Sequence, residues 1–300
     1  MLDACLTDLK QALEQHLDQA TKPTGYEASP VWLAARYSLL GGGKRVRPEL
    51  LFRTCLMFND SVPKESVAFS ASLEMIHSYS LIHDDLPAMD DDDFRRGRPS
   101  CHMVYGEATA ILAGDLLLNR AYENMLSSIQ EEPSSAVLSA MRELAQAAGG
   151  EGMILGQDRD LAMEDPAFGR ASPSDVIKMA ELKTTRLIRA AILMGGHLSD
   201  VPADVLALLS EIGHAAGLSF QIKDDILDCV SNRDTLGKTP HKDEVAGKKT
   251  FVTVSGMQGA LTALASETAK LEAGFERLKE RGYQVSPLLD YLRGLVERTC

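Results

Sequence analysis

Two clusters of aspartates are the residues whose types and spacing most directly suggest chemistry. The first cluster, from Asp84 to Asp93, contains six carboxylates within ten residues. Like charges at this density repel one another unless cations neutralise them, and a hard metal ion with oxygen ligands is a natural partner. A solvated acidic turn is the alternative. The apolar Leu81 and Ile82 just before Asp84 favour a position at the rim of a core.

The choice of carboxylates within this cluster depends on how the preceding helix ends. On a regular helix Asp91 nearly eclipses Asp84, whereas Asp90 points roughly 120° away. Pro87 removes a backbone donor and clashes with the preceding turn, so a kink or bulge could swing Asp90 toward Asp84. The residues alone leave both Asp90 and Asp91 open as metal ligands.

The second cluster ends another apolar stretch. Four of its side chains share one helix face at positions i, i+3, i+4 and i+7: Gln221, Asp224, Asp225 and Asp228. An ordinary ion-paired helix end is the simpler interpretation. If the helices of both clusters faced each other, the cavity could hold several magnesium ions, which keep waters and recruit substrate phosphates.

Basic residues that could bind phosphate accompany both clusters. Arg95 and Arg96 directly follow the first cluster, which is informative in a chain with a formal net charge of -12. His77 lies two helical turns before Asp84 on the same face, where it could be a core histidine or could reach a phosphate. The other candidates are Lys44, Arg45, Arg47, Arg98, Lys183, Lys238, Lys248 and Lys249. Each of these could also be a solvated surface cation.

Composition and periodicity predict an all-α protein. Apolar residues recur at helical spacing, for example at Leu6, Leu9, Leu13 and Leu17, and aromatic residues make up only 5% of the chain. Helix breaks are expected at 41–43, 131–135, 149–150, 165–173, 200–202 and 237–247. Ser172-Pro173 and the segment 61–65 have the pattern of helix starts. No shift in composition marks a boundary, so we expect a single domain over residues 1–300.

Several classes of protein are disfavoured. The acidic charge argues against a general nucleic-acid binder. The five cysteines lack the spacing of a zinc site or a disulfide framework, which fits a reduced cytoplasm. The N-terminal segment mixes acids with apolar residues, unlike a secretory signal. Apolar stretches are interrupted well short of the roughly 20 residues that a membrane span needs.

These motifs together resemble the trans-prenyl (polyprenyl) diphosphate synthase family over most of the chain, with its bacterial farnesyl diphosphate synthases as the closest members. The motifs that carry the resemblance are Gly42 to Pro48, Asp84 to Arg96, Gly156-Gln157 with Asp160, Lys183-Thr184, Phe220 to Asp228, and Gly237-Lys238. The resemblance implies a helical bundle around a central deep cavity, an isoprenoid synthase-like fold. It also implies a homodimer.

The resemblance assigns roles to the matched positions. Asp84, Asp90 and Asp224 would bind three magnesium ions that clamp an allylic diphosphate, either dimethylallyl or geranyl diphosphate. The implied ligands of that diphosphate are Arg95, Lys183, Thr184, Gln221, Lys238 and Lys248, with Lys183 also counted as catalytic. Isopentenyl diphosphate, the second substrate, would be bound by Lys44, Arg47, His77 and Arg96. Ionisation would leave an allylic cation, which the isopentenyl double bond attacks before a proton is lost.

Product length is implied by residues just before the first cluster. Tyr79, five residues before Asp84, and its neighbour Ser80 would close the elongation pocket and favour a C15 product. Geranylgeranyl synthesis is the nearest alternative. A terpene cyclase, an inactive synthase subunit and an acidic calcium-binding protein are further alternatives. The family commonly has Gly or Ala after the Lys-Thr pair, whereas Thr185 and Arg186 follow it here.

Overall fold

The computed structural model describes residues 2–129, 132–230 and 248–298. In these ranges the regular secondary structure is helical apart from one short hairpin, which confirms the all-α prediction. The elements are α1 (Leu2–Ala20), α2 (Pro30–Leu39), α3 (Val46–Phe58), α4 (Ser66–Asp84), β1 (Phe94–Arg95), β2 (Arg98–Pro99), α5 (Cys101–Tyr105), α6 (Glu107–Ser128), α7 (Ser135–Ala148), α8 (Met153–Glu164), η1 (Pro166–Phe168), α9 (Pro173–Ala180), η2 (Glu181–Thr185), α10 (Arg186–Leu198), α11 (Ala203–Val230), α14 (Phe251–Glu280) and α15 (Ser286–Glu297).

The chain divides into two compact units. Unit 1 comprises Met1–Phe52 and Pro63–Ser134, and unit 2 comprises Arg53–Val62 and Ser135–Cys300. The division passes through α3. The expectations of one domain and of a central cavity stay predictions.

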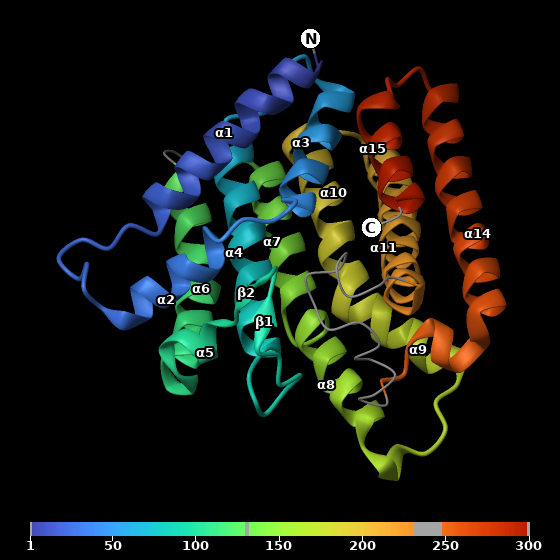
Figure 1. Cartoon of the computed structure of the whole chain (residues 1–300). Helices are drawn as coiled ribbons and strands as arrows, with labels where there is room; N and C mark the ends of the chain where they lie inside the picture. The colour runs from blue at the N-terminus through green and yellow to red at the C-terminus, as the bar shows by residue number, and fades with distance from the viewer. Residues whose placement is uncertain (1, 130–131, 231–247, 299–300) are drawn as a thin grey trace. The chain divides into compact units, whose positions relative to one another are not determined.

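Helix α4 is the core of unit 1, and it packs against α6, α1 and α2 (Figure 1). Most of its residues are buried, as expected for a helix that has small or apolar side chains on every face. Asn124 of α6 ties the two helices together: its amide donates to the Ala68 carbonyl at 2.7 Å and to the Ser72 hydroxyl at 2.9 Å. The helix that leads to the first acidic cluster is therefore held along its length.

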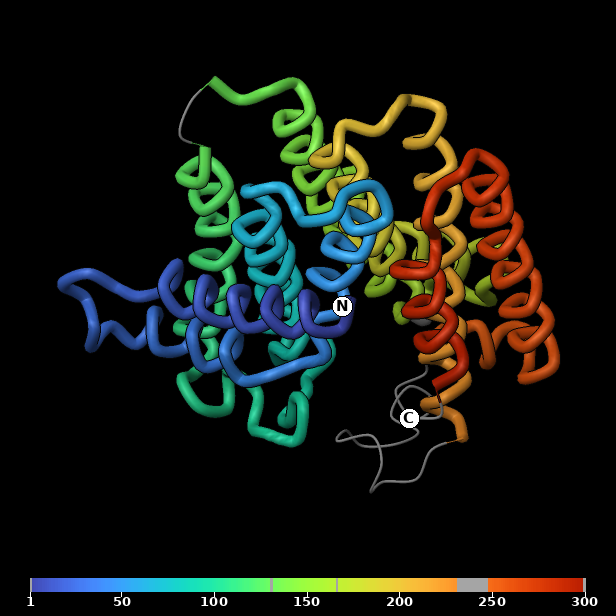
Figure 2. Tube along the Cα trace, turned by 90° about the horizontal axis from the view of Figure 1, so that it is seen from above, coloured from blue at the N-terminus to red at the C-terminus, as the bar shows by residue number. Residues whose placement is uncertain are grey.

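Helix α11 is the core of unit 2, with α14 running beside it and α10 packed against it (Figure 2). By length and composition alone α11 could cross a membrane, but 61% of its most apolar window is buried inside the protein. We interpret it as a core helix. It carries the second acidic cluster at its C-terminal end.

Most of the predicted helix boundaries are confirmed. The breaks at 41–43, 149–150, 165–173 and 200–202 all lie between helices, and Ser172 caps α9 in a capping box with Asp175. The segment 61–65 leads directly into a helix, with Glu65 as the N-cap, but Ser61 and Pro63 do not cap it as the sequence pattern indicated. A turn closed by the Ser66 amide on the Pro63 carbonyl, at 3.0 Å, comes first, and α4 begins at Ser66. The break at 237–247 lies outside the described residues, as does part of the one at 131–135.

Candidate active site

The first acidic cluster folds back on the end of α4. The helix ends at Asp84, and the Asp90 amide donates to the Asp84 carbonyl at 2.8 Å. Pro87 does not kink a continuing helix, because the helix stops three residues before it. This end agrees with the bias against helical geometry ahead of proline. The predicted approach of Asp90 to Asp84 is present in the backbone. Asp91 takes the sparsely populated left-handed conformation, with φ of 50°.

Asp85 has a different environment from Asp84 although the two are adjacent. Its carboxylate is 2% exposed and accepts hydrogen bonds from Arg95, whose Nε lies 2.8 Å away. Arg95 also bridges to Asp92 at 3.2 Å. Burial would lower the pKa of Arg95, but hydrogen bonding and attraction by Asp85 raise it, so this guanidinium remains charged. We did not predict the role of Asp85. Its position, one residue and about 100° from Asp84, was the available signal.

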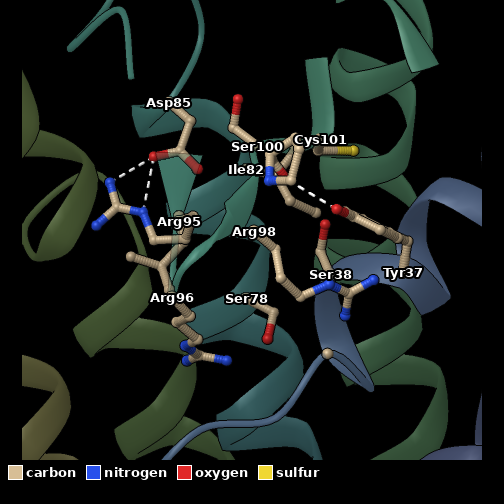
Figure 3. Close-up of a pocket in the computed structure, with 13 residues that line it drawn as sticks. Tyr37, Ser38, Ser78, Ile82, Asp85, Arg95, Arg96, Arg98, Ser100 and Cys101 are labelled. Carbon is tan, nitrogen blue, oxygen red and sulfur yellow. Dashed lines mark hydrogen bonds and ion pairs between the residues drawn. The ribbon is translucent and has the colours of Figure 1, made fainter. Parts of the chain in front are cut away.

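The β1–β2 hairpin places the two arginines that follow the cluster on different partners. Arg95 faces the acidic loop (Figure 3). Arg96, with φ of 55°, instead donates from Nη1 to the Gly42 carbonyl. A side chain at Gly43 would lie 2.8 Å from the Arg96 Cζ, so glycine is needed where the loop before α3 meets this guanidinium.

His77 lies among these cations. Its pKa is lowered well below 6.5, first by burial and then by the positive charges of Arg47 and Arg96. The imidazole is therefore neutral at neutral pH. Unit 1 thus brings together three of the four residues expected to bind isopentenyl diphosphate, namely His77, Arg47 and Arg96. The fourth, Lys44, is exposed in the loop before α3.

A hollow in unit 1 lies behind this cluster, between α2, α4 and the hairpin (Figure 3). Arg98 stacks over the Tyr37 ring at 4.2 Å from the ring centroid, and the Tyr37 hydroxyl donates to the Pro99 carbonyl at 2.8 Å. These contacts hold the hairpin against α2. Arg98 thus supports the hairpin that carries Arg95 and Arg96.

Tyr79 and Ser80 lie on α4 as expected. Tyr79 is 6% exposed and its ring meets His83 edge-on, with 5.8 Å between centroids. Burial raises the pKa of the phenol, so the side chain stays neutral. The His83 Nε2–H donates to the Ile111 carbonyl at 3.0 Å, in space left open by Gly114. Ser80 donates to the His77 carbonyl at 2.9 Å.

The Lys183-Thr184 pair in unit 2 lies in a π-helical turn, η2, between α9 and α10. Such turns inside α-helices are frequent at functional sites. The turn is closely packed because two glycines face it: a Cβ at Gly156 would lie 2.2 Å from the Lys183 nitrogen, and one at Gly217 would lie 2.6 Å from the Thr185 Cα. Gly156, next to Gln157, therefore lets α8 pack closely against η2.

The polar contacts of η2 join the predicted residues of unit 2. Lys183 pairs with the buried Asp160, and the Thr184 hydroxyl donates to the Gln221 Oε1 at 2.7 Å. Thr185 is buried against Gly217, and Arg186 is exposed, so the departure at these positions adds packing rather than a cation beside Lys183.

The acids of α11 differ in burial. Asp225 is 6% exposed, accepts from the Gln221 amide at 2.8 Å, and accepts from the Phe251 backbone at 2.8 Å, which anchors the start of α14. Asp224 is half-exposed and pairs with Arg298, whose guanidinium lies 4.2 Å from the Phe220 ring centroid. Arg298 was missed, because one arginine near the end of the sequence belongs to no motif.

Of the two remaining expected diphosphate ligands, only Lys248 lies within the described residues. Lys248 precedes Thr250, the N-cap of α14, and its carbonyl accepts from Thr253 at 3.1 Å. Lys238 lies outside the described residues.

The donor set suits magnesium. Asp84, Asp90 and Asp224 offer hard carboxylate oxygens, the ligands that magnesium takes together with water and substrate phosphate. Within the part of the chain that the structure describes, no three His, Cys, Asp or Glu side chains form a ready-made metal cage.

Comparison with known proteins identifies the class. The family model for polyprenyl synthetase matches residues 31–284, and the chain belongs to this family. It is 39% identical over 290 residues to the farnesyl diphosphate synthase of Escherichia coli strain K12, covering 96% of this chain and 94% of that protein. The Bacillus subtilis farnesyl diphosphate synthase is 35% identical over 292 residues, covering 96% and 97%.

Solved structures agree. A geranyltransferase from Legionella pneumophila superposes with a TM-score of 0.84 at 31% identity, covering 100% of this chain and 97% of that one. A geranyltransferase from Helicobacter pylori, complexed with magnesium and isoprenyl diphosphate, gives 0.83 at 29% identity, covering 97% and 94%. The expected isoprenoid synthase-like fold is confirmed.

Proposed function

We propose that this protein is a prenyltransferase that condenses isopentenyl diphosphate with dimethylallyl and then geranyl diphosphate to give farnesyl diphosphate. The observation that carries the proposal is that each acidic cluster has, in the same unit, side chains able to donate hydrogen bonds to a phosphate. Arg95 and Arg96 accompany the first cluster, and the Thr184–Gln221 contact accompanies the second. Near full-length similarity to farnesyl diphosphate synthases supports the same conclusion.

The allylic diphosphate is the group whose bond to carbon breaks. Lys183, Thr184, Gln221, Lys238, Lys248 and Arg95 bind its oxygens and stabilise the negative charge that grows on the leaving group. The ion pair between Lys183 and Asp160 supports the role proposed for Lys183, because the carboxylate orients the ammonium group before the substrate arrives.

Isopentenyl diphosphate is bound by Lys44, Arg47, Arg96 and a neutral His77. The low pKa of His77 supports donation of one N–H to the diphosphate without adding another charge to the cluster. The isopentenyl double bond attacks the allylic cation, a new carbon–carbon bond forms, and the departing diphosphate takes the proton that is lost.

Magnesium, when bound, neutralises the diphosphate oxygens and assists departure of the leaving group. Asp84 and Asp90 from unit 1 and Asp224 from unit 2 are its proposed ligands, and we propose three ions. The approach of the Asp90 backbone to Asp84 supports a shared ligand pair.

A homodimer in the cytoplasm is also part of this proposal. Large apolar side chains on α5 and α6 are about half exposed: Met103, Val104, Ile111 and Leu112. A second copy of the chain is the occupant that the family membership favours, and light scattering of the purified protein measures its mass directly.

The test is product analysis after incubation with isopentenyl and geranyl diphosphates plus magnesium. We expect a C15 product. A C20 product would favour geranylgeranyl synthesis, and no prenyl product would contradict the proposed reaction.

Tyr79 is the proposed floor of the elongation pocket. Tyr79→Ala removes a buried ring, and we expect C20 and longer products to replace most of the C15 product. Ser128→Ala, on α6, is the matched control and leaves the product length unchanged. Unchanged products from Tyr79→Ala would remove the ring from this role.

A further inference from the structure

A buried carboxylate lies beneath the basic cluster of unit 1. Glu74, on α4, is 1% exposed and stands one helical turn before His77. Its Oε1 accepts from the Arg45 Nη1 at 2.9 Å, and the Arg96 Nη2 lies 4.0 Å from the same oxygen. One negative charge therefore faces two guanidinium groups from separate loops.

Both arginines have backbone conformations that need outside support. Arg45 has φ of 47° and Arg96 has φ of 55°, in the left-handed region that side chains other than glycine rarely adopt. Such conformations persist where surrounding contacts hold them. Both arginines lie against the carboxylate of Glu74.

The remaining contacts of each arginine complete the arrangement. Arg45 donates to Glu14 at 2.7 and 3.1 Å and to the Leu39 carbonyl at 2.9 Å. Arg96 donates to the Gly42 carbonyl, two residues before Lys44. The loop before α3 and the hairpin are therefore fastened to each other and, through Glu74, to α4.

We propose that Glu74 is a positioning residue for the binding of isopentenyl diphosphate, an inference that rests on the function proposed above. Its carboxylate holds the guanidinium groups of Arg45 and Arg96. Arg45 in turn fixes the loop that carries Lys44 and leads into α3, where Arg47 lies in the first turn. Glu74 itself touches no substrate, because its side chain is enclosed beneath the cluster.

If the ion pairs of Glu74 served stability alone, a substitution of Glu74 would affect the two substrates differently from what we propose. Loss of general stability lowers the amount of active enzyme and affects both substrates alike. Loss of positioning weakens mainly one substrate, since the Glu74 contacts reach Arg45 and Arg96. Among the proposed ligands of the allylic diphosphate, Arg95 is held by Asp85 and Asp92, and the others belong to unit 2.

Glu74→Gln tests this difference, because the amide keeps the shape of the side chain and removes the charge. We expect the KM for isopentenyl diphosphate to rise roughly tenfold, the effect of losing one charge-assisted hydrogen bond. The KM for geranyl diphosphate should change less than about twofold. Equal KM changes for both substrates, or no change, would overturn the proposal.

Two further measurements keep the outcome clear. Glu14→Gln removes the charge of the other carboxylate that contacts the same arginine, and we expect less than about a threefold change in either KM, since the Glu14 side chain is half-exposed and solvent screens its charge. Calorimetric titration of the wild type and Glu74→Gln with isopentenyl diphosphate measures binding directly and requires no turnover. If the wild type were inactive, the proposed function would be contradicted, but the effect of Glu74 on binding would still be measured. If Glu74→Gln does not fold, Glu74→Asp, which keeps the charge at shorter reach, shows the same one-substrate effect or refutes it.

Discussion

The two acidic clusters have similar side chains but lie on different kinds of backbone. In unit 1 the acids after Asp84 lie on an irregular loop, with Asp91 in a left-handed conformation, and the helix before them is regular. In unit 2 the acids lie on the regular helix α11, and the irregular segment is the π-turn that carries Lys183 and Thr184. Irregular backbone is costly and is retained where side chains must be aimed.

The charges around the two clusters differ as well. In unit 2, Lys183 and Arg298 each pair with a carboxylate. In unit 1, His77 experiences mainly the positive charge of arginines. In unit 2, Lys183 and Arg298 thus each pair with a different carboxylate, whereas in unit 1 Arg45 and Arg96 both face the single carboxylate of Glu74.

Removing one proposed metal ligand from each unit gives the largest expected effect. We expect Asp84→Asn and Asp224→Asn each to lower kcat/KM by about 10²- to 10³-fold, the range for losing one group that stabilises transition-state charge. Steady-state kinetics with geranyl diphosphate measures it. The exposed Asp93→Asn and Asp204→Asn are matched controls in the same segments, each with less than a threefold change. A large loss in only one unit would mean that the clusters are not equivalent.

Changing the packing of the π-turn gives an intermediate effect. A methyl group at position 217 would press on Thr185, so Gly217→Ala should lower the free energy of unfolding by about 1–3 kcal/mol, typical of overpacking. It should also raise the KM for geranyl diphosphate, because Thr184 shifts relative to Gln221. Thermal unfolding and kinetics measure the two effects.

Gly294→Ala is the control for this change. Gly294 lies in α15, where an added methyl group would meet open space. We expect the substitution to raise the free energy of unfolding by about 0.5–1 kcal/mol. A stable, fully active Gly217→Ala variant would show that the irregular turn needs no close packing.

The titration of His77 gives the smallest effect. Its pKa is lowered by folding, so as the pH falls below about 6.5 the unfolded chain takes up a proton that the folded protein does not, and stability decreases. Above that pH, both states are neutral and His77 contributes no pH dependence. His77→Asn should flatten the stability profile between pH 7 and 5, by less than about 1.4 kcal/mol per pH unit. An unchanged stability profile in denaturant unfolding would contradict the lowered pKa of His77, which burial and the neighbouring arginines produce.

Periodicity and composition were sufficient to predict the helical class and most of the helix breaks, because both follow from local preferences. They also placed Gln221 and Asp225 on one face, where their side chains are hydrogen bonded. The contacts of Arg298 and Glu74 join segments that are far apart in the chain, so no local sequence pattern predicted them. The π-turn was equally hidden, since Lys183 and its neighbours are ordinary helix formers.

The π-turn also constrains chain length. It holds one residue more than an α-helical turn, so η2 amounts to a single-residue insertion in a helix that otherwise runs from α9 to α10. Deleting that residue would restore regular hydrogen bonding but rotate α9 by about 100° relative to α10. The buried Val176 and Met179 would then leave the core. A relative one residue shorter in this segment must therefore either pack α9 differently or present its lysine and threonine in another direction.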